Sequence, residues 1–113
     1  IQIVANEASI ILLAGKNEGR ISTNTICKNP ILSILCSNKN YTNDELKIVS
    51  YEIDFFDHKQ KIGNIHNVGA AISTNDIEKI KYLPSGTQLF VSIKYGGFSN
   101  GIRQARDVVF IVD

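Results

Sequence analysis

The clearest regularity in the chain is an alternation of apolar and polar residues over residues 47–56. Every second residue from Val49 to Phe55 is apolar and the residues between them are polar. This is the period of a β-strand with one buried and one solvated face. Residues 57–60 are polar and typical of a turn, and residues 61–68 predict a returning strand. The pattern therefore predicts a β-hairpin.

Further apolar runs predict the remaining strands. Residues 87–95 alternate in the same way as the first strand. Residues 104–112 close the chain as a strand, and its last part is apolar on both faces, which is typical of a central position in a sheet. Two shorter runs, residues 8–13 and 31–36, predict strands near the start of the chain.

One pattern, Ile-Ser-Thr-Asn-x-Ile-x-Lys, occurs twice, at residues 21–28 and 72–79. Each copy predicts a short helix, because Ser22 and Ser73 can accept a hydrogen bond from an unpaired amide of the first turn. Pro30 limits the first helix to one or two turns. The repetition indicates two related halves that share one core.

Together these elements predict a mainly β domain with two short helices, an antiparallel, β-sandwich-like arrangement and an internal pseudo-repeat. The 113 residues are expected to form a single domain, with pseudo-repeat halves at about 8–45 and 46–112. A chain of this length buries enough surface to fold without metal ions or disulfide bonds.

Charge argues against two classes of partner. The chain has 12 Lys and Arg against 11 Asp and Glu, interspersed along its length, and a net charge of +1. We therefore expect neither nucleic acid nor an anionic membrane as partner. No apolar run is long enough to insert into a bilayer, and the start of the chain shows no signal-peptide pattern.

Since Met is absent altogether, we expect a mature form or an excised domain of a longer protein, although a stand-alone protein remains an alternative.

Cys27 and Cys36 are the only cysteines. Their spacing fits no zinc site. Either they form a disulfide in an oxidising compartment, or they are two small buried hydrophobic side chains.

Candidate catalytic groups are few. His58 falls in the predicted turn and His66 near a strand end, where each is expected to be solvated. Glu52 and Asp54 share one strand face, about 7 Å apart by strand rise, and paired carboxylates can act as acid and base. A simpler explanation of these two carboxylates is that they lie on the solvent-exposed face of an amphipathic strand. No serine-hydrolase, zinc-protease or calcium-loop pattern is present, so we predict no catalytic residue, no metal and no cofactor.

The remaining candidates for binding are surface residues. Tyr41 lies in an Asn-rich loop and Phe98 in a Gly-rich loop. Each ring can anchor a partner or fold back over the end of the sandwich. Arg103 and Arg106 begin the last strand and can bind either a partner or the strand carboxylates. Edge strands offer a third route, by pairing with another chain.

Five short segments stand in an order similar to that of one known family. They are Glu-Gly-Arg-Ile-Ser at 18–22, Leu-Lys-Ile-Val-Ser-Tyr at 46–51, Ile-Ser-Thr-Asn at 72–75, Gly-Thr-Gln-Leu-Phe-Val-Ser-Ile-Lys at 86–94 and Arg-Asp-Val-Val-Phe-Ile-Val at 106–112. In this order they resemble the C-terminal periplasmic domain of the GldM (PorM) family of Bacteroidetes gliding motility and type IX secretion. The first segment departs from the Gly-Gly-x-Ile-Ser that the family typically carries.

The resemblance implies a non-catalytic module of the periplasm or cell envelope. Proteins of that family are anchored in the inner membrane and reach across the periplasm as dimers toward outer-membrane-associated partners. The expected partners are therefore other envelope proteins or a second copy of the chain. The alternatives are a ligand- or carbohydrate-binding β-sandwich module appended to another protein, and a small enzyme that uses Glu52 and Asp54.

Overall fold

The structure is a computed structural model that describes residues 9–36, 47–96 and 102–113. Within these ranges, seven residues are described by their backbone alone: Ser9, Leu35, Cys36, Ile102, Arg103, Arg106 and Asp107. The predicted loops that carry Tyr41 and Phe98 lie outside the described residues.

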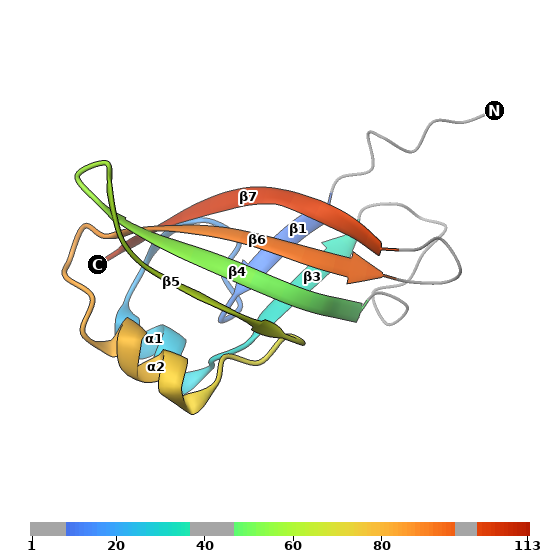
Figure 1. The fold of residues 1–113 in the computed structure, drawn as a ribbon, viewed down its shortest axis with the longest axis horizontal. Helices are drawn as coiled ribbons and strands as arrows, with labels where there is room; N and C mark the ends of the chain where they lie inside the picture. The colour runs from blue at the N-terminus through green and yellow to red at the C-terminus, as the bar shows by residue number, and fades with distance from the viewer. Residues whose placement is uncertain (1–8, 37–46, 97–101) are drawn as a thin grey trace.

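Five strands form the larger sheet, in the order β2-β7-β6-β4-β5 (Figure 1). They are β2 (Gly19–Ile21), β4 (Lys47–Asp57), β5 (Gln60–Val68), β6 (Gln88–Gly96) and β7 (Ile102–Val112). Neighbouring strands are antiparallel, except that β2 runs parallel to β7. The predicted hairpin is β4–β5. From Phe110 onward β7 has β2 on one side and β6 on the other, which confirms its expected interior position.

Two strands form a smaller antiparallel sheet, β1 (Ser9–Leu13) and β3 (Leu32–Cys36). Strand β1 ends at a tight turn in which Leu13 and Lys16 exchange backbone hydrogen bonds of 2.8 and 2.9 Å. The two central residues, Ala14 and Gly15, have φ values of 51° and 87°. Glycine adopts such values without steric cost, which explains why the strand stops where the sequence reaches Gly15.

Both predicted helices are present, α1 (Thr23–Lys28) and α2 (Thr74–Lys81), and they lie side by side (Figure 1). The Ser22 hydroxyl accepts a hydrogen bond of 3.0 Å from the amide of Thr25. The Ser73 hydroxyl accepts one of 3.2 Å from the amide of Asp76. The two copies of the repeat therefore begin their helices with the same cap, as the sequence predicts.

The segments next to the two copies also meet. Ile72 donates its amide proton to the Pro30 carbonyl at 2.9 Å, and Leu32 donates to the Ala70 carbonyl at 2.8 Å. The strands that follow differ, because β3 belongs to the smaller sheet and β6 to the larger one. The likeness shown is thus that of two capped helices, and a duplication of complete halves stays a prediction.

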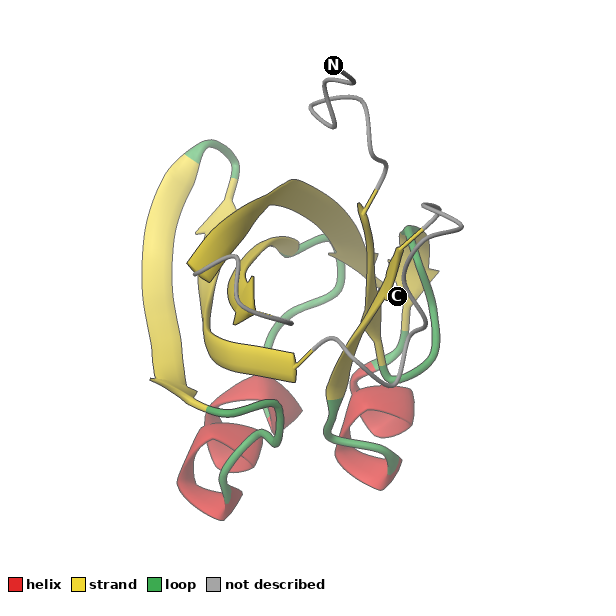
Figure 2. Cartoon of the chain, turned by 90° about the vertical axis from the view of Figure 1, so that its right-hand side faces the viewer, coloured by secondary structure: helices red, strands yellow, loops and turns green. Residues whose placement is uncertain are grey.

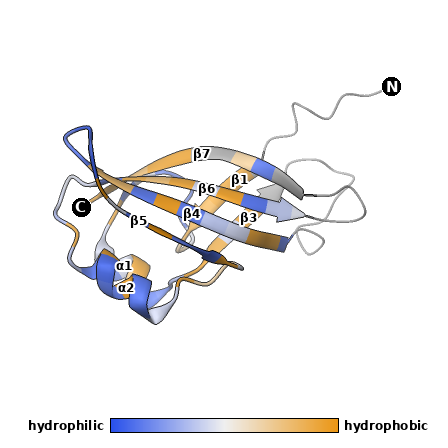
Figure 3. Cartoon of the chain, viewed as in Figure 1, coloured by the Kyte–Doolittle hydropathy of each residue, from blue (hydrophilic) through white to orange (hydrophobic). Residues whose placement is uncertain are grey.

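One core joins all these elements. Its fully buried side chains come from the larger sheet, the smaller sheet and both helices, and they include Ile53, Phe110, Leu32, Ile26 and Ile80. Figure 2 shows the strands around this core, with both helices at one side. Hydrophilic residues collect on α2 and at the tip of the β4–β5 hairpin (Figure 3). The mainly β class with two short helices is confirmed, and two sheets that share one core fit a sandwich-like arrangement. The larger sheet is mixed and not purely antiparallel, because β2 runs parallel to β7.

Candidate functional site

The larger sheet has a hollow of about 500 Å³ on the face that points away from the core. We call this face the outer face and the depression the sheet hollow. Its polar lining comes from four neighbouring strands and includes His66, Glu52, Ser50, Ser92, Lys94 and Gln104. A volume of this order suits a small molecule.

The hollow follows from the register of the strands. Glu52 of β4 lies opposite His66 of β5 and opposite Ser92 of β6. In the next row, Ser50 lies opposite Lys94, which in turn faces Gln104 of β7. The short serine side chains fall on the two middle strands and the longer side chains surround them. Strand alternation sends the intervening residues, such as Tyr51, into the core.

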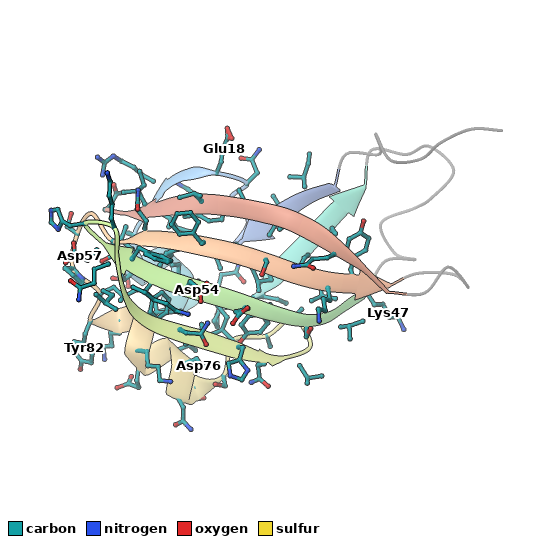
Figure 4. All side chains as sticks on the ribbon, turned by 45° about the horizontal axis from the view of Figure 1, so that its top comes forward. Glu18, Lys47, Asp54, Asp57, Asp76 and Tyr82 are labelled. Atoms are coloured by element: carbon teal, nitrogen blue, oxygen red, sulfur yellow. The ribbon has the colours of Figure 1, made fainter. Side chains whose placement is uncertain are left out.

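The carboxylates of β4 are bound on the outer face. The Asn64 amide donates to Glu52 Oε2 at 3.0 Å and to Asp54 Oδ1 at 2.5 Å. Lys61 Nζ lies 3.2 Å from the same Asp54 oxygen. Figure 4 labels Asp54 on β4, beside β5. The predicted sharing of one face by Glu52 and Asp54 is confirmed, and their nearest partners come from β5.

The two charges that line the sheet hollow are not paired with each other. Glu52 and Lys94 are both exposed, and the two lie on adjacent strands one row apart. Within the described part of the chain, no ion pair joins Lys94 to any carboxylate. The hollow therefore presents a free cation at one point and a carboxylate held by a neutral amide at another.

Next to the hollow the outer face is apolar. Phe56 and Phe90 pack edge to face, with ring centroids 5.0 Å apart and an interplanar angle of 72°. Val109 lies opposite Phe90 and is 37% exposed. Ile111 is the next residue of β7 on this face, and it is half-buried. We call Phe56, Phe90, Val109 and Ile111 the outer apolar patch.

The predicted arginines fall near the hollow in register. Arg103 lies opposite Tyr95, next to the pair formed by Gln104 and Lys94. Arg106 belongs to an irregular step of β7, where two residues stand between the partners of Val91 and Ile93. Strand β6 separates β7 from β4. The pairing of these arginines with a partner, or with the β4 carboxylates, stays a prediction.

The structure places the two cysteines on different elements. Cys27 lies on α1, half-buried, with a free thiol. Cys36 is the last residue of β3, where only the backbone is described. A disulfide between them and the alternative of two small buried hydrophobic side chains both stay predictions.

The two histidines have different surroundings. His58 lies in the β4–β5 turn, where its side chain is 95% exposed and Nδ1 is 2.7 Å from Asp57 Oδ1, so its predicted position in a solvated turn is confirmed. His66 is also exposed, at the rim of the sheet hollow. Among the described residues, no three His, Cys, Asp or Glu side chains are grouped as metal ligands would be. None of the helices described is long and apolar enough to cross a membrane.

Tyr51 connects β4 to the start of α2 from the core side. Its hydroxyl donates a hydrogen bond of 3.3 Å to the Ala71 carbonyl. Burial raises the pKa of this hydroxyl above 10.0, and the negative charge of Asp76 raises it further, while a backbone hydrogen bond from Ser73 acts in the opposite direction. These contacts hold the hairpin against the helix, on the side of the sheet away from the hollow.

No model of a known protein family matches this chain, and no curated protein matches it. The resemblance to the GldM family therefore rests on the order of the five short segments. In the structure these segments fall on β2 with the cap of α1, on β4, on the cap of α2, on β6 and on β7. They contribute to four of the five strands of the larger sheet and to the two helix starts.

Proposed function

We propose that this chain is a non-catalytic interaction module of the bacterial cell envelope, which binds a protein partner through the outer face of the larger sheet. The observation that carries the proposal is the outer apolar patch. Two aromatic rings and two aliphatic side chains lie together on the outer face of the larger sheet. Val109 is exposed and the other three side chains are half-buried. Apolar side chains that stay accessible together on one surface are typical of interaction sites.

The chemistry of the described residues supports binding over catalysis. The carboxylates of Glu52 and Asp54 are held by Asn64 and Lys61. Neither histidine is hydrogen-bonded to a serine, a cysteine or a threonine in the described part of the chain. A hydrolytic site needs a nucleophile, a base and an orienting group within hydrogen-bond reach. The location in the envelope comes from the resemblance to the GldM family.

Site-specific photo-crosslinking tests the proposal in intact cells. A crosslinking amino acid at Phe90 is expected to capture one envelope protein, because this ring lies at the centre of the patch. The same amino acid at Lys28, an exposed residue of α1, is the control. Capture of the same proteins in equal amounts from both positions would show that the patch is not the contact surface.

The loop aromatics need a separate test. If they anchor the partner, replacing Tyr41 and Phe98 by Ala weakens capture of the protein that the Phe90 crosslink identifies. Unchanged capture would exclude the loops and leave the patch as the contact. The two experiments thus separate the predicted loop contact from the contact on the sheet.

A further inference from the structure

We infer that the sheet hollow is a binding site for a small polyhydroxylated carboxylic acid, of the sugar-acid class. This goes beyond the interaction with a protein and does not depend on it. The hollow lies across β5, β4, β6 and β7, beside the outer apolar patch.

The first argument is the separation of charge. Lys94 is exposed, and in the described part of the chain it forms no ion pair. An anionic group of a ligand is its natural complement, because a hydrogen bond between two charged groups is about twice as strong as one between neutral groups. Glu52 stands one row away on the adjacent strand, and its Oε2 is occupied by Asn64. The other carboxylate oxygen accepts no described hydrogen bond, so it is available to a hydroxyl group.

The second argument is the neutral lining. Ser50 and Ser92 form the floor, and Gln104 and His66 stand at opposite sides of the hollow. Hydroxyl, amide and imidazole groups both donate and accept hydrogen bonds. Ligand hydroxyls have the same double capacity. A ligand with several hydroxyl groups therefore matches the lining between the two charges.

The neutral groups distinguish this class from an amino acid. An α-amino acid places its carboxylate at Lys94 and its ammonium at Glu52, but it leaves Ser50, Ser92 and Gln104 without a partner. A sugar acid holds its carboxylate at one end of a ring and its hydroxyls along the ring. It can therefore bind Lys94 through the carboxylate and the neutral groups through its hydroxyls.

Titration of the isotope-labelled chain with glucuronate, followed by amide chemical shifts, tests the inference. Shifts are expected at Glu52, Ser92 and Lys94. Glucose, which lacks the carboxylate, is expected to bind about tenfold more weakly, and acetate, which lacks the hydroxyls, likewise. Serine, as a small amino acid, tests the alternative of a zwitterionic ligand.

Two variants and one control complete the experiment. Lys94→Gln should reduce glucuronate affinity to that of glucose, and Ser92→Leu should abolish binding by filling the floor. Lys28→Gln removes a lysine from α1 and should change nothing. Thermal unfolding of each variant shows that it is folded, and a Lys94 variant that fails to fold leaves the Ser92 variant as the test.

Three results would overturn the inference. They are an absence of localised shifts with glucuronate, equal affinity for acetate and glucuronate, which would mean an adventitious ion only, and tighter binding of serine than of glucuronate. An equal loss of affinity in the Lys94 and Lys28 variants would likewise show that the effect is one of net charge.

Discussion

At the scale of single residues, the repeated serines have the same physical task. Ser22 and Ser73 each accept a hydrogen bond from the third residue after them, and Ile26 and Ile77 each donate an amide proton to the carbonyl of the corresponding serine. Each helix is short, with 6 and 8 residues. A short helix has few internal hydrogen bonds to offset the cost of its nucleation, so its cap has a large share in its stability.

Removing a cap should therefore destabilise the domain. We expect Ser22→Ala and Ser73→Ala each to lower the free energy of unfolding by about 1 kcal/mol. Urea denaturation measures the change. Ser85→Ala is the matched control, because Ser85 is exposed and lies outside both helices. Equal stability of the Ser73 and Ser85 variants would contradict the capping role.

Tyr51 makes the stability of the domain depend on pH in the alkaline range. Its pKa is raised in the folded state by burial and by the Asp76 charge. A folded-state pKa above the unfolded value means that the phenol contributes its full stability below pH 10 and loses it as the pH rises through the folded pKa. The domain should therefore become less stable above about pH 10.

The variant Tyr51→Phe isolates this contribution. At neutral pH it loses the hydrogen bond to the Ala71 carbonyl, which should cost about 1 kcal/mol. Above pH 10 the difference in free energy of unfolding between this variant and the wild-type chain should become smaller. Urea denaturation at several pH values measures this difference. Tyr82→Phe is the control, because Tyr82 is 74% exposed and its replacement should change the stability little. Figure 4 labels this residue. A Tyr51 difference that stays constant to high pH would refute the expectation.

At the scale of elements, the β4–β5 turn combines a tight connection with one unfavourable residue. His58 and Lys59 have φ values of 50° and 68°, as in the two-residue turns that match the twist of a hairpin. Residues other than Gly, Asn, Asp and His are uncommon there, so Lys59 is the unfavourable residue of the turn. The hairpin therefore forms despite the sequence of its turn, because the alternating residues of β4 and β5 fix its register.

Relieving this strain should stabilise the hairpin. We expect Lys59→Gly to raise the free energy of unfolding by about 0.5 kcal/mol. The reason is that the strain of the left-handed conformation at Lys59 exceeds the entropy that glycine adds to the unfolded chain. Thermal unfolding measures the change. Gln60→Gly, one residue later and inside β5, should instead destabilise the domain. A lower stability of the Lys59 variant would contradict this expectation. It would mean that the Lys59 side chain stabilises the wild-type domain by more than its backbone conformation destabilises it.

The elements also show what the sequence could and could not predict. Strands β4, β6 and β7 have a clear period or a long apolar run, so their positions follow from local pattern. Strand β2 has only 3 residues, too few to show a period, and was not predicted. The sheet hollow depends on which residues face each other across four strands. Register of this kind is decided by long-range packing, so Ser50, Ser92 and Lys94 could be predicted to face solvent but not to lie together.

At the scale of the whole molecule, β5 is an edge of the larger sheet, and its backbone is partly protected. Gly69 donates to the Val49 carbonyl, and hydrogen-bonded pairs alternate along an antiparallel ladder. The amides of Asn64, His66 and Val68 therefore point away from β4. The Asn67 side chain accepts the Val68 amide proton at 2.8 Å. This hydrogen bond occupies one of the edge amides that could otherwise pair with another chain.

Removing this protection should favour self-association. We expect Asn67→Ala to increase the dimeric or aggregated fraction at high concentration, because the Val68 amide is then free and the Val68 side chain is already 81% exposed. Analytical ultracentrifugation measures the fraction. Asn67→Asp keeps an acceptor oxygen at the same place and should remain as monomeric as the wild-type chain. An Ala variant with unchanged association would show that the rest of the edge is sufficient protection.

The single core implies that the two sheets unfold together. Ile34 of the smaller sheet and Ile53 of the larger one belong to the same buried cluster, and both helices contribute to it. Neither sheet can expose this cluster without uncovering the other.

We therefore expect Ile34→Val and Ile53→Val each to lower the free energy of unfolding by about 1 kcal/mol and to shift one common transition. Val68→Ala, at an exposed position, should change the stability little. Circular dichroism and tyrosine fluorescence should give coincident curves for every variant. If Ile34→Val instead produced an early transition while the main one stayed in place, the smaller sheet would be a separate folding unit and the shared core would not govern cooperativity.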